Sequence, residues 1–152
     1  MKKRKLLLIL ASLLVLGNLW AQGDPWYDDF EAAKAEAKST GKYILVNFSG
    51  SDWCVWCIKL SDEVLKQDNF VAYAENNLVL FTADFPRRKQ QPASLKQQNE
   101  NLAKKYKIRG FPTVLILDPD GNLVQQTGYR QGGPDPYVKH IQEIIKADQQ
   151  SK

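Results

Sequence analysis

The chain has 152 residues, which is enough for one domain with a single buried core. Its formal net charge of +4 comes from the cations at positions 2–5, because the rest of the chain carries 17 basic and 17 acidic residues. This balance argues against a nucleic-acid-binding function, and we expect the short basic run at 87–89 to be a solvated loop. The two cysteines are too few for a small domain held together by several disulfides.

The N-terminus has the pattern of a secretory signal peptide. The basic cluster at 2–5 precedes the apolar run Leu6–Leu16, and the small residue Ala21 follows. That run is shorter than the roughly 20 residues that span a bilayer, although an uncleaved anchor extending to Trp20 is the alternative. We therefore expect a signal peptide over 1–21, cleaved after Ala21, and a mature domain over 22–152. The mature protein is expected to be a monomer, periplasmic or secreted.

The first half of the chain alternates helical and strand patterns. Alanines among charged residues predict a helix from Trp26 to Ser39, with Gly41 as its C-cap. The nearly continuous apolar run over 43–48 predicts a strand covered on both faces. Helical patterns follow over 58–66 and 69–74, as two helices or one kinked helix, and then a second buried strand over 78–81.

The second half begins with a polar, proline-containing loop over 85–93 and continues with a predicted helix over 94–106. Strands are predicted over 113–117 and 123–127, joined by the turn signal Asp118-Pro119-Asp120-Gly121 as an antiparallel hairpin. A helix with apolar residues at helical spacing is predicted over 135–147. The order predicts an α/β fold: a mostly parallel central sheet, helices on both faces, and a C-terminal antiparallel hairpin.

Cys54 and Cys57 form a Cys-x-x-Cys pair between a buried strand and a helix, the context of a redox site. Unpaired backbone N–H groups at a helix N-terminus stabilise a thiolate at the first cysteine. A two-residue spacer brings the second sulfur within bonding reach. We therefore expect Cys54 to be the nucleophile and Cys57 the resolving thiol.

Two other readings of the pair are weaker. A structural zinc site needs about four ligands, and the chain offers two cysteines and the distant His140. A purely structural disulfide that closes so short a loop contributes only about 2 kcal/mol in the chain-entropy model. We expect neither a metal nor a cofactor, since the cysteine pair itself carries two electrons.

The segment Ser49–Cys57 resembles the active-site segment of the thioredoxin superfamily, particularly of bacterial exported thioredoxin-like proteins of the disulfide reductase type. The similarity covers about residues 26–146. A second motif, Ile108-Arg109-Gly110-Phe111-Pro112-Thr113, matches the family loop in which a cis-proline faces the cysteine pair. The resemblance implies a cis bond before Pro112, and it implies that Trp53, Phe111 and Pro112 contact the substrate. For Trp53, simple packing beside the site is the alternative.

Two positions depart from the family pattern. Many thioredoxins have a buried acid on the strand before the active site, and the matching residue here is Asn47, which cannot accept a proton as a carboxylate does. Asp52 is no substitute, because its place in the loop predicts that it caps the following helix. The spacer Val55-Trp56 lacks an ionisable group, which favours a less oxidising couple than that of the family's oxidases.

We therefore expect a thiol–disulfide oxidoreductase that acts on protein disulfides in the cell envelope, on the reducing side, with electrons from a membrane partner. A disulfide oxidase or isomerase is the alternative within the same class. A non-catalytic module that binds client proteins is the alternative from another class. The loop over 85–93, with the helix after it, is an insertion relative to a minimal thioredoxin, and it either influences partner choice or is a tolerated surface insertion.

Overall fold

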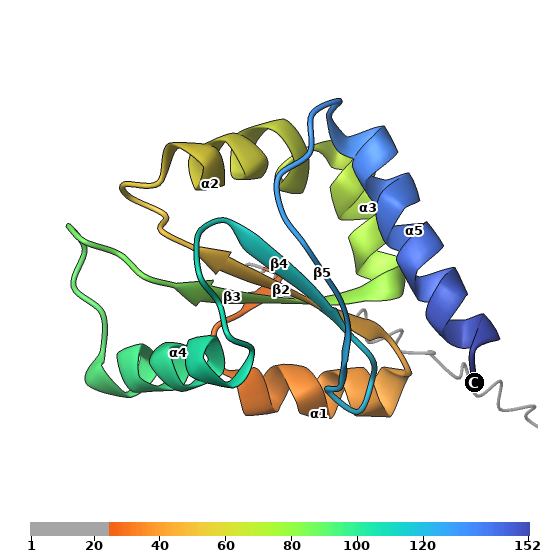
Figure 1. The fold of residues 1–152 in the computed structure, drawn as a ribbon, viewed down its shortest axis with the longest axis horizontal. Helices are drawn as coiled ribbons and strands as arrows, with labels where there is room; N and C mark the ends of the chain where they lie inside the picture. Colours follow the sequence, from red (N-terminus) through yellow and green to blue (C-terminus); the bar gives the residue numbers. More distant parts are fainter. Residues whose placement is uncertain (1–24) are drawn as a thin grey trace, which may run out of the picture.

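The computed structural model describes residues 25–152 (Figure 1). The predicted signal peptide and its cleavage site lie outside the described residues. Within the described part of the chain, no helix is long and apolar enough to cross a membrane.

Five strands form one sheet, in the spatial order β1-β3-β2-β4-β5. The strand β1 pairs with β3 in parallel and β3 pairs with β2 in parallel, whereas β2–β4 and β4–β5 are antiparallel. The expected C-terminal hairpin is confirmed. The sheet is mixed rather than mostly parallel, because β4 also runs antiparallel to β2. The strands are β1 (Trp26–Tyr27), β2 (Tyr43–Ser49), β3 (Leu78–Asp84), β4 (Thr113–Leu117) and β5 (Leu123–Thr127).

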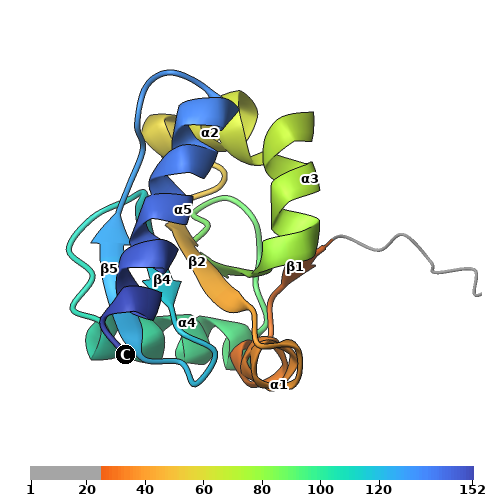
Figure 2. The same ribbon diagram turned by 90° about the vertical axis from the view of Figure 1, so that its right-hand side faces the viewer.

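Helices cover both faces of this sheet (Figures 1 and 2). One face packs against α1 and α4, and the other packs against α2, α3 and α5. The expected α/β layers are therefore confirmed. The helices are α1 (Phe30–Thr40), α2 (Val55–Leu60), α3 (Asp68–Asn77), α4 (Ala93–Lys105) and α5 (Pro134–Gln150), and a π-helical turn, η1 (Ser61–Leu65), continues α2.

The prediction that the first helix begins at Trp26 is wrong. Trp26 and Tyr27 lie opposite Leu80 and Phe81 as the edge strand β1. The helix starts only after Asp29, whose carboxylate accepts hydrogen bonds from the N–H groups of the first turn. Its predicted end is confirmed, since Gly41 has a φ of 72° and its N–H caps the last turn.

The helical stretch after the cysteine pair is two helices. The π-helical turn η1 ends α2, and Gln67 has extended backbone before α3 begins at Asp68. The buried Leu60 and Val64 from this stretch still reach the same core as Phe70 of α3. The break thus changes the direction of the chain without opening the core.

Alternation along β2 places successive side chains on opposite faces of the sheet. Leu45 belongs to the core under α2, α3 and α5, and Val46 and Phe48 belong to the core over α1 and α4. By the same alternation Asn47 points toward α2, the helix that carries the cysteine pair. The alternation along β2 therefore places Asn47 on the face of the sheet that also carries the cysteine pair.

Candidate active site

Cys54 and Cys57 form a disulfide across the first turn of α2, with their Cα atoms 5.2 Å apart. Cys54 is the N-cap of α2 and has extended backbone, so the helix begins immediately after it. A tight turn precedes the pair, because the carbonyl oxygen of Gly50 accepts the backbone N–H groups of Trp53 at 3.2 Å and Cys54 at 2.8 Å. The turn over residues 50–54, here called the redox turn, therefore follows β2 directly and leads to Cys54.

Backbone N–H groups surround the two sulfur atoms. Cys54 Sγ accepts the N–H of Cys57 at 3.2 Å, and Cys57 Sγ accepts the N–H of Gly50 at 3.5 Å. Cys54 and Cys57 are 7% and 3% exposed, so these bonds lie in a poorly hydrated environment. A donor aimed at Cys54 Sγ favours the thiolate once the disulfide is reduced.

The two spacer residues are largely exposed. Val55 is 72% exposed and Trp56 is 53% exposed. The ring of Trp56 packs against Tyr129 at 5.5 Å between centroids, with Lys59 close to both rings. Among the described residues, the hydrogen bonds that reach the two sulfurs come from the backbone, as expected for a spacer without an ionisable group.

The bond between Phe111 and Pro112 is cis, as the resemblance implies. It lies just before β4, the neighbour of β2 in the sheet. The Phe111 ring meets the Trp53 ring edge to face, with centroids 6.0 Å apart. The three residues expected to contact substrate thus belong to two loops: Trp53 precedes Cys54, and Phe111 and Pro112 precede β4. The contact between the Trp53 and Phe111 rings joins these two loops.

The prediction that Asp52 caps α2 is wrong, because Cys54 occupies the cap position. The Asp52 carboxylate instead accepts three backbone N–H groups from the loop after β3: Arg87 at 2.9 Å, Arg88 at 2.7 Å and Lys89 at 2.9 Å. Hydrogen bonding, chiefly from Arg87, lowers the pKa of Asp52. The local sequence does not disclose this partner, which lies 35 residues away.

Phe85 and Arg87 belong to the site, although sequence reasoning did not select them. Trp53 Nε1 donates to the carbonyl oxygen of Phe85 at 2.8 Å, and the Phe85 ring lies 5.0 Å from that of Phe111. The Arg87 guanidinium lies 3.6 Å from the centroid of the Trp53 ring. Their only sequence signal is an insertion of mixed aromatic and basic residues.

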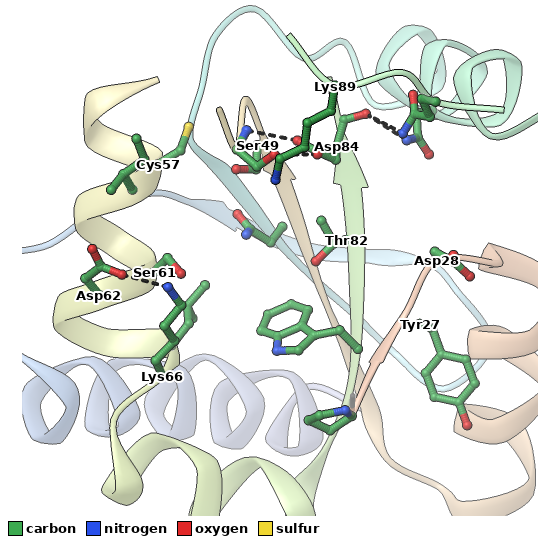
Figure 3. Close-up of a pocket in the computed structure, with 18 of the residues that line it drawn as sticks. Tyr27, Asp28, Ser49, Cys57, Ser61, Asp62, Lys66, Thr82, Asp84 and Lys89 are labelled. Carbon is green, nitrogen blue, oxygen red and sulfur yellow. Dashed lines mark hydrogen bonds and ion pairs between the residues drawn. The ribbon is translucent and has the colours of Figure 1, made fainter. Parts of the chain in front are cut away.

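A pocket of about 1040 Å³ lies between the helical stretch of α2 and η1 on one side and the strands β1, β2 and β3 on the other. Figure 3 shows Cys57 on one side of this pocket, Ser49, Thr82 and Asp84 on the strands opposite, and Lys89 reaching in from the loop above. Asn47 also lines the pocket and is 8% exposed. Its Oδ1 is buried and has no hydrogen-bond partner among the described residues.

The position that matches the family's buried acid is therefore buried, as expected, and it shares a pocket with the second cysteine. An amide oxygen there can accept a hydrogen bond and cannot take up a proton at ordinary pH. Asp84 is the carboxylate of this pocket on the adjacent strand, and it accepts the backbone N–H of Ser51 at 2.9 Å and its hydroxyl at 2.6 Å.

Comparison with known proteins agrees with this geometry. The family model of the thioredoxin-like domain matches residues 30–135. The disulfide bond reductase DsbH of Chlamydia pneumoniae is 33% identical over 120 residues, which cover 79% of this chain and 72% of that protein. The thioredoxin-related protein DsbJ of the same organism is 29% identical over 68% of this chain and 30% of its own length.

Solved structures give the same result. A structure of the DsbH oxidoreductase superposes with a TM-score of 0.76 and 34% identity, over 80% of this chain and 83% of that one. The C-terminal domain of DsbD from Neisseria meningitidis, at 18% identity, superposes with a TM-score of 0.55 over 75% of this chain and 90% of that domain, a likeness of fold alone. The chain thus belongs to the thioredoxin-like family, and it is a thiol–disulfide oxidoreductase with the Cys54–Cys57 disulfide as its redox pair.

Proposed function

We propose that this oxidoreductase works as a protein-disulfide reductase in the cell envelope, with Cys54 as the nucleophile and Cys57 as the resolving thiol. The geometry of the helix cap supports the assignment of Cys54 as the nucleophile: Cys54 Sγ lies at the start of α2 and accepts the N–H of Cys57. The same bond lowers the free energy of a Cys54 thiolate relative to its thiol. Cys57 lies one turn deeper, against the pocket that contains Asn47.

The reaction is a two-step exchange. The Cys54 thiolate attacks one sulfur of the substrate disulfide, forming a mixed disulfide and releasing the other substrate sulfur, which takes up a proton. Cys57 then loses its proton, and its thiolate attacks Cys54 Sγ and displaces the second substrate thiolate. The substrate gains two electrons and two protons in total, and the enzyme ends as the Cys54–Cys57 disulfide.

The reducing direction is supported by the surroundings of the sulfurs. Val55 and Trp56 are exposed and contribute no charge to the Cys54 thiolate. A backbone N–H without a charged spacer residue stabilises the thiolate less than a cation would, and the dithiol is then a better reductant, since the reduced form of the couple is less favoured. The relative DsbH is named as a disulfide bond reductase, which agrees with this direction.

Trp53, Phe111 and Pro112 are the proposed substrate contacts. Trp53 and Phe111 form one aromatic surface beside the disulfide, and Pro112 leads into β4 next to it. An extended substrate segment placed along the backbone before Pro112 brings its disulfide to Cys54. The cell-envelope location rests on the signal-like segment 1–21, and a membrane protein is the proposed electron donor.

Trapping tests the assignment of roles. A Cys57→Ser variant cannot resolve the mixed disulfide, so it should hold envelope proteins in complexes that dithiothreitol releases. The matched Cys54→Ser variant should trap nothing. Complexes formed equally by both variants would contradict the roles. A redox potential near that of a strong disulfide oxidant, with the pKa of Cys54 far below 7, would contradict the reducing direction.

A further inference from the structure

The segment 85–92 between β3 and α4, here called the basic loop, is built onto the redox turn. The Asp52 carboxylate, two residues before Cys54, holds three consecutive backbone N–H groups of this loop. The loop also begins by extending the sheet, since the N–H of Phe85 donates to the carbonyl oxygen of Ser49 at 2.8 Å. Its position is thus tied to the turn that carries Cys54.

The basic loop is also held by aromatic contacts of its first residue, Phe85. Phe85 stacks at 6.5 Å from the buried Phe48 and at 5.0 Å from Phe111, which precedes the cis-proline. The far end is held through the carbonyl oxygen of Asp84, which accepts the side-chain amides of Gln91 at 3.2 Å and Asn99 at 2.9 Å. A surface insertion without a role does not need anchors at both ends and in its middle.

These anchors present cations next to Trp53, the residue before Cys54. Arg87 lies over the ring of Trp53, and Arg88 and Lys89 are exposed on the same loop. Arg109, exposed in the cis-proline loop, lines a surface pocket together with Phe85. Within residues 25–152, none of these four cations has a carboxylate oxygen within 4.0 Å of its side-chain nitrogens.

The local charge is not a property of the whole chain. Beyond the cations at positions 2–5, acidic and basic residues balance at 17 each, so the three consecutive cations of the basic loop are a local feature. The acids beside these cations are Asp52, whose oxygens accept backbone N–H groups, and Glu100, which lines the pocket with Arg109. Asp84 precedes the loop and lines the other pocket with Lys89, and its carboxylate accepts the N–H and the hydroxyl of Ser51. Free cations around a reactive group attract anionic partners and raise the rate of their encounter.

We propose that the basic loop and Arg109 form a docking surface for acidic segments of the protein's disulfide substrates, with Asp or Glu within a few residues of the reacting cysteine. This inference rests on the proposed function, because the surface acts on the partner that Cys54 attacks. A substrate cysteine at Cys54 places its flanking residues over Trp53, where Arg87, Arg88 and Arg109 can pair with carboxylates. The occupant is a protein, since Arg87 lies over the ring of Trp53, next to the cysteine that attacks the substrate, and Arg109 lines a pocket with Phe85.

Disulfide peptides test this directly. Three peptides with the same intramolecular disulfide differ only in the flanking residues, which are Glu, Gln or Lys, and each is mixed with the reduced protein. The Glu peptide should oxidise the protein about tenfold faster than the Gln peptide at about 0.02 M salt, and the Lys peptide should be slowest. At about 1 M salt the three rates should converge, because the Debye length falls to about 3 Å.

A pair of variants locates the effect. Arg88→Gln/Lys89→Gln should reduce the ratio of the Glu rate to the Gln rate from about tenfold to about threefold. The control Lys139→Gln/Lys146→Gln removes two exposed charges from α5, and it should keep the wild-type ratio. Circular dichroism shows whether both variants are folded, and the salt dependence of the wild type tests the proposal without any variant.

Several outcomes would overturn the inference. Equal rates with the Glu and Gln peptides at low salt would do so, as would an identical loss of preference in the α5 control. Binding of a DNA oligonucleotide or of anionic phosphatidylglycerol vesicles that depends on Arg88 and Lys89, without any peptide preference, would assign the surface to another partner. Absence of exchange with all three peptides would instead contradict the proposed function, and the inference would fall with it.

Discussion

Trp53 Nε1 donates a 2.8 Å hydrogen bond to the carbonyl oxygen of Phe85, across 32 residues of sequence. This bond joins the turn that carries Cys54 to the first residue after β3. It also fixes the Trp53 ring between the Arg87 guanidinium and the ring of Phe111. Trp53 therefore joins three loops beside the cysteine pair: its own turn, the loop after β3 and the loop before β4.

Replacing Trp53 by Phe should keep most of the ring contacts and remove the bond to Phe85. We expect the free energy of unfolding to fall by about 1 kcal/mol, because a half-buried carbonyl oxygen loses its partner. Trp56→Phe is the matched control, since Trp56 is 53% exposed, and it should change stability by less than about 0.5 kcal/mol. Urea denaturation followed by circular dichroism measures both, and a larger loss in Trp56→Phe would contradict this account.

Asp52→Asn should release the basic loop. A neutral amide oxygen is a weaker acceptor than a carboxylate for the N–H groups of Arg87, Arg88 and Lys89. We expect these three amides to exchange with deuterium at least about tenfold faster in the variant, as local opening becomes easier. The N–H of Ser51, which donates to Asp84, is the internal control and should be little affected.

The same contact predicts an acid-dependent change in the wild type. Hydrogen bonds from Arg87 and its neighbours lower the pKa of Asp52 below its ordinary 3.8. A lowered pKa means that the contact is fully present above pH 3.8 and is lost as the pH falls through the folded-state pKa. Trp53 fluorescence should follow this loss in the wild type, and the Asp52→Asn variant should show no such step.

Much of the fold could be predicted because the signals were local. The strands over 113–117 and 123–127 have the predicted ends, since Asp118 accepts the N–H groups of Asp120 and Asn122 and shapes the turn between them. Gly41 ended its helix as expected because a left-handed residue is needed there. The edge strand β1 was missed because two residues have no periodicity, and it exists through its pairing with Leu80 and Phe81.

The site was predictable only in its central residues. The Cys54–Cys57 pair and the cis bond before Pro112 belong to motifs that are contiguous in sequence, so the resemblance predicted both. The partners of Asp52 lie 35 to 37 residues away, and helix capping was the only role visible from its neighbours. Asn47 likewise lies opposite Thr82 on the neighbouring parallel strand, and the register that pairs them could not be predicted from the sequence.

Gly50→Ala should disturb the redox turn. A Cβ at Gly50 would overlap the indole of Trp53, whose position is fixed by Phe85. We expect a loss of about 1–3 kcal/mol in the free energy of unfolding, as for other overpacked sites, and a shift in the fluorescence of Trp53. Gly110→Ala is the control, because a Cβ there would meet no atom within 4 Å. Thermal denaturation compares the two, and equal losses would show that the turn tolerates the methyl group.

Asn47→Asp should install a proton acceptor beside Cys57. The side chain keeps its size, and Oδ1 at this buried position has no hydrogen-bond partner among the described residues. Desolvation should therefore raise the pKa of the new carboxyl group above its unfolded value of about 3.9. A raised pKa means that the folded state binds the proton more tightly, so the stability relative to wild type should fall as the pH rises through that pKa. A shift of about two units corresponds to a loss of about 3 kcal/mol at high pH and to none at low pH.

The same variant should change the second step of the reaction. An ionised carboxylate that shares the pocket with Cys57 can take the proton from its thiol, so resolution of the mixed disulfide should become faster above the pKa of the new acid. Stopped-flow measurement of the resolving step between pH 5 and pH 8 (about the range in which such an acid titrates) should show a step absent from the wild type. Asn47→Leu is the control: it removes the unpaired oxygen without adding a base and should show no step. If Asn47→Asp and Asn47→Leu give the same pH profile, the residue at position 47 does not exchange a proton with Cys57.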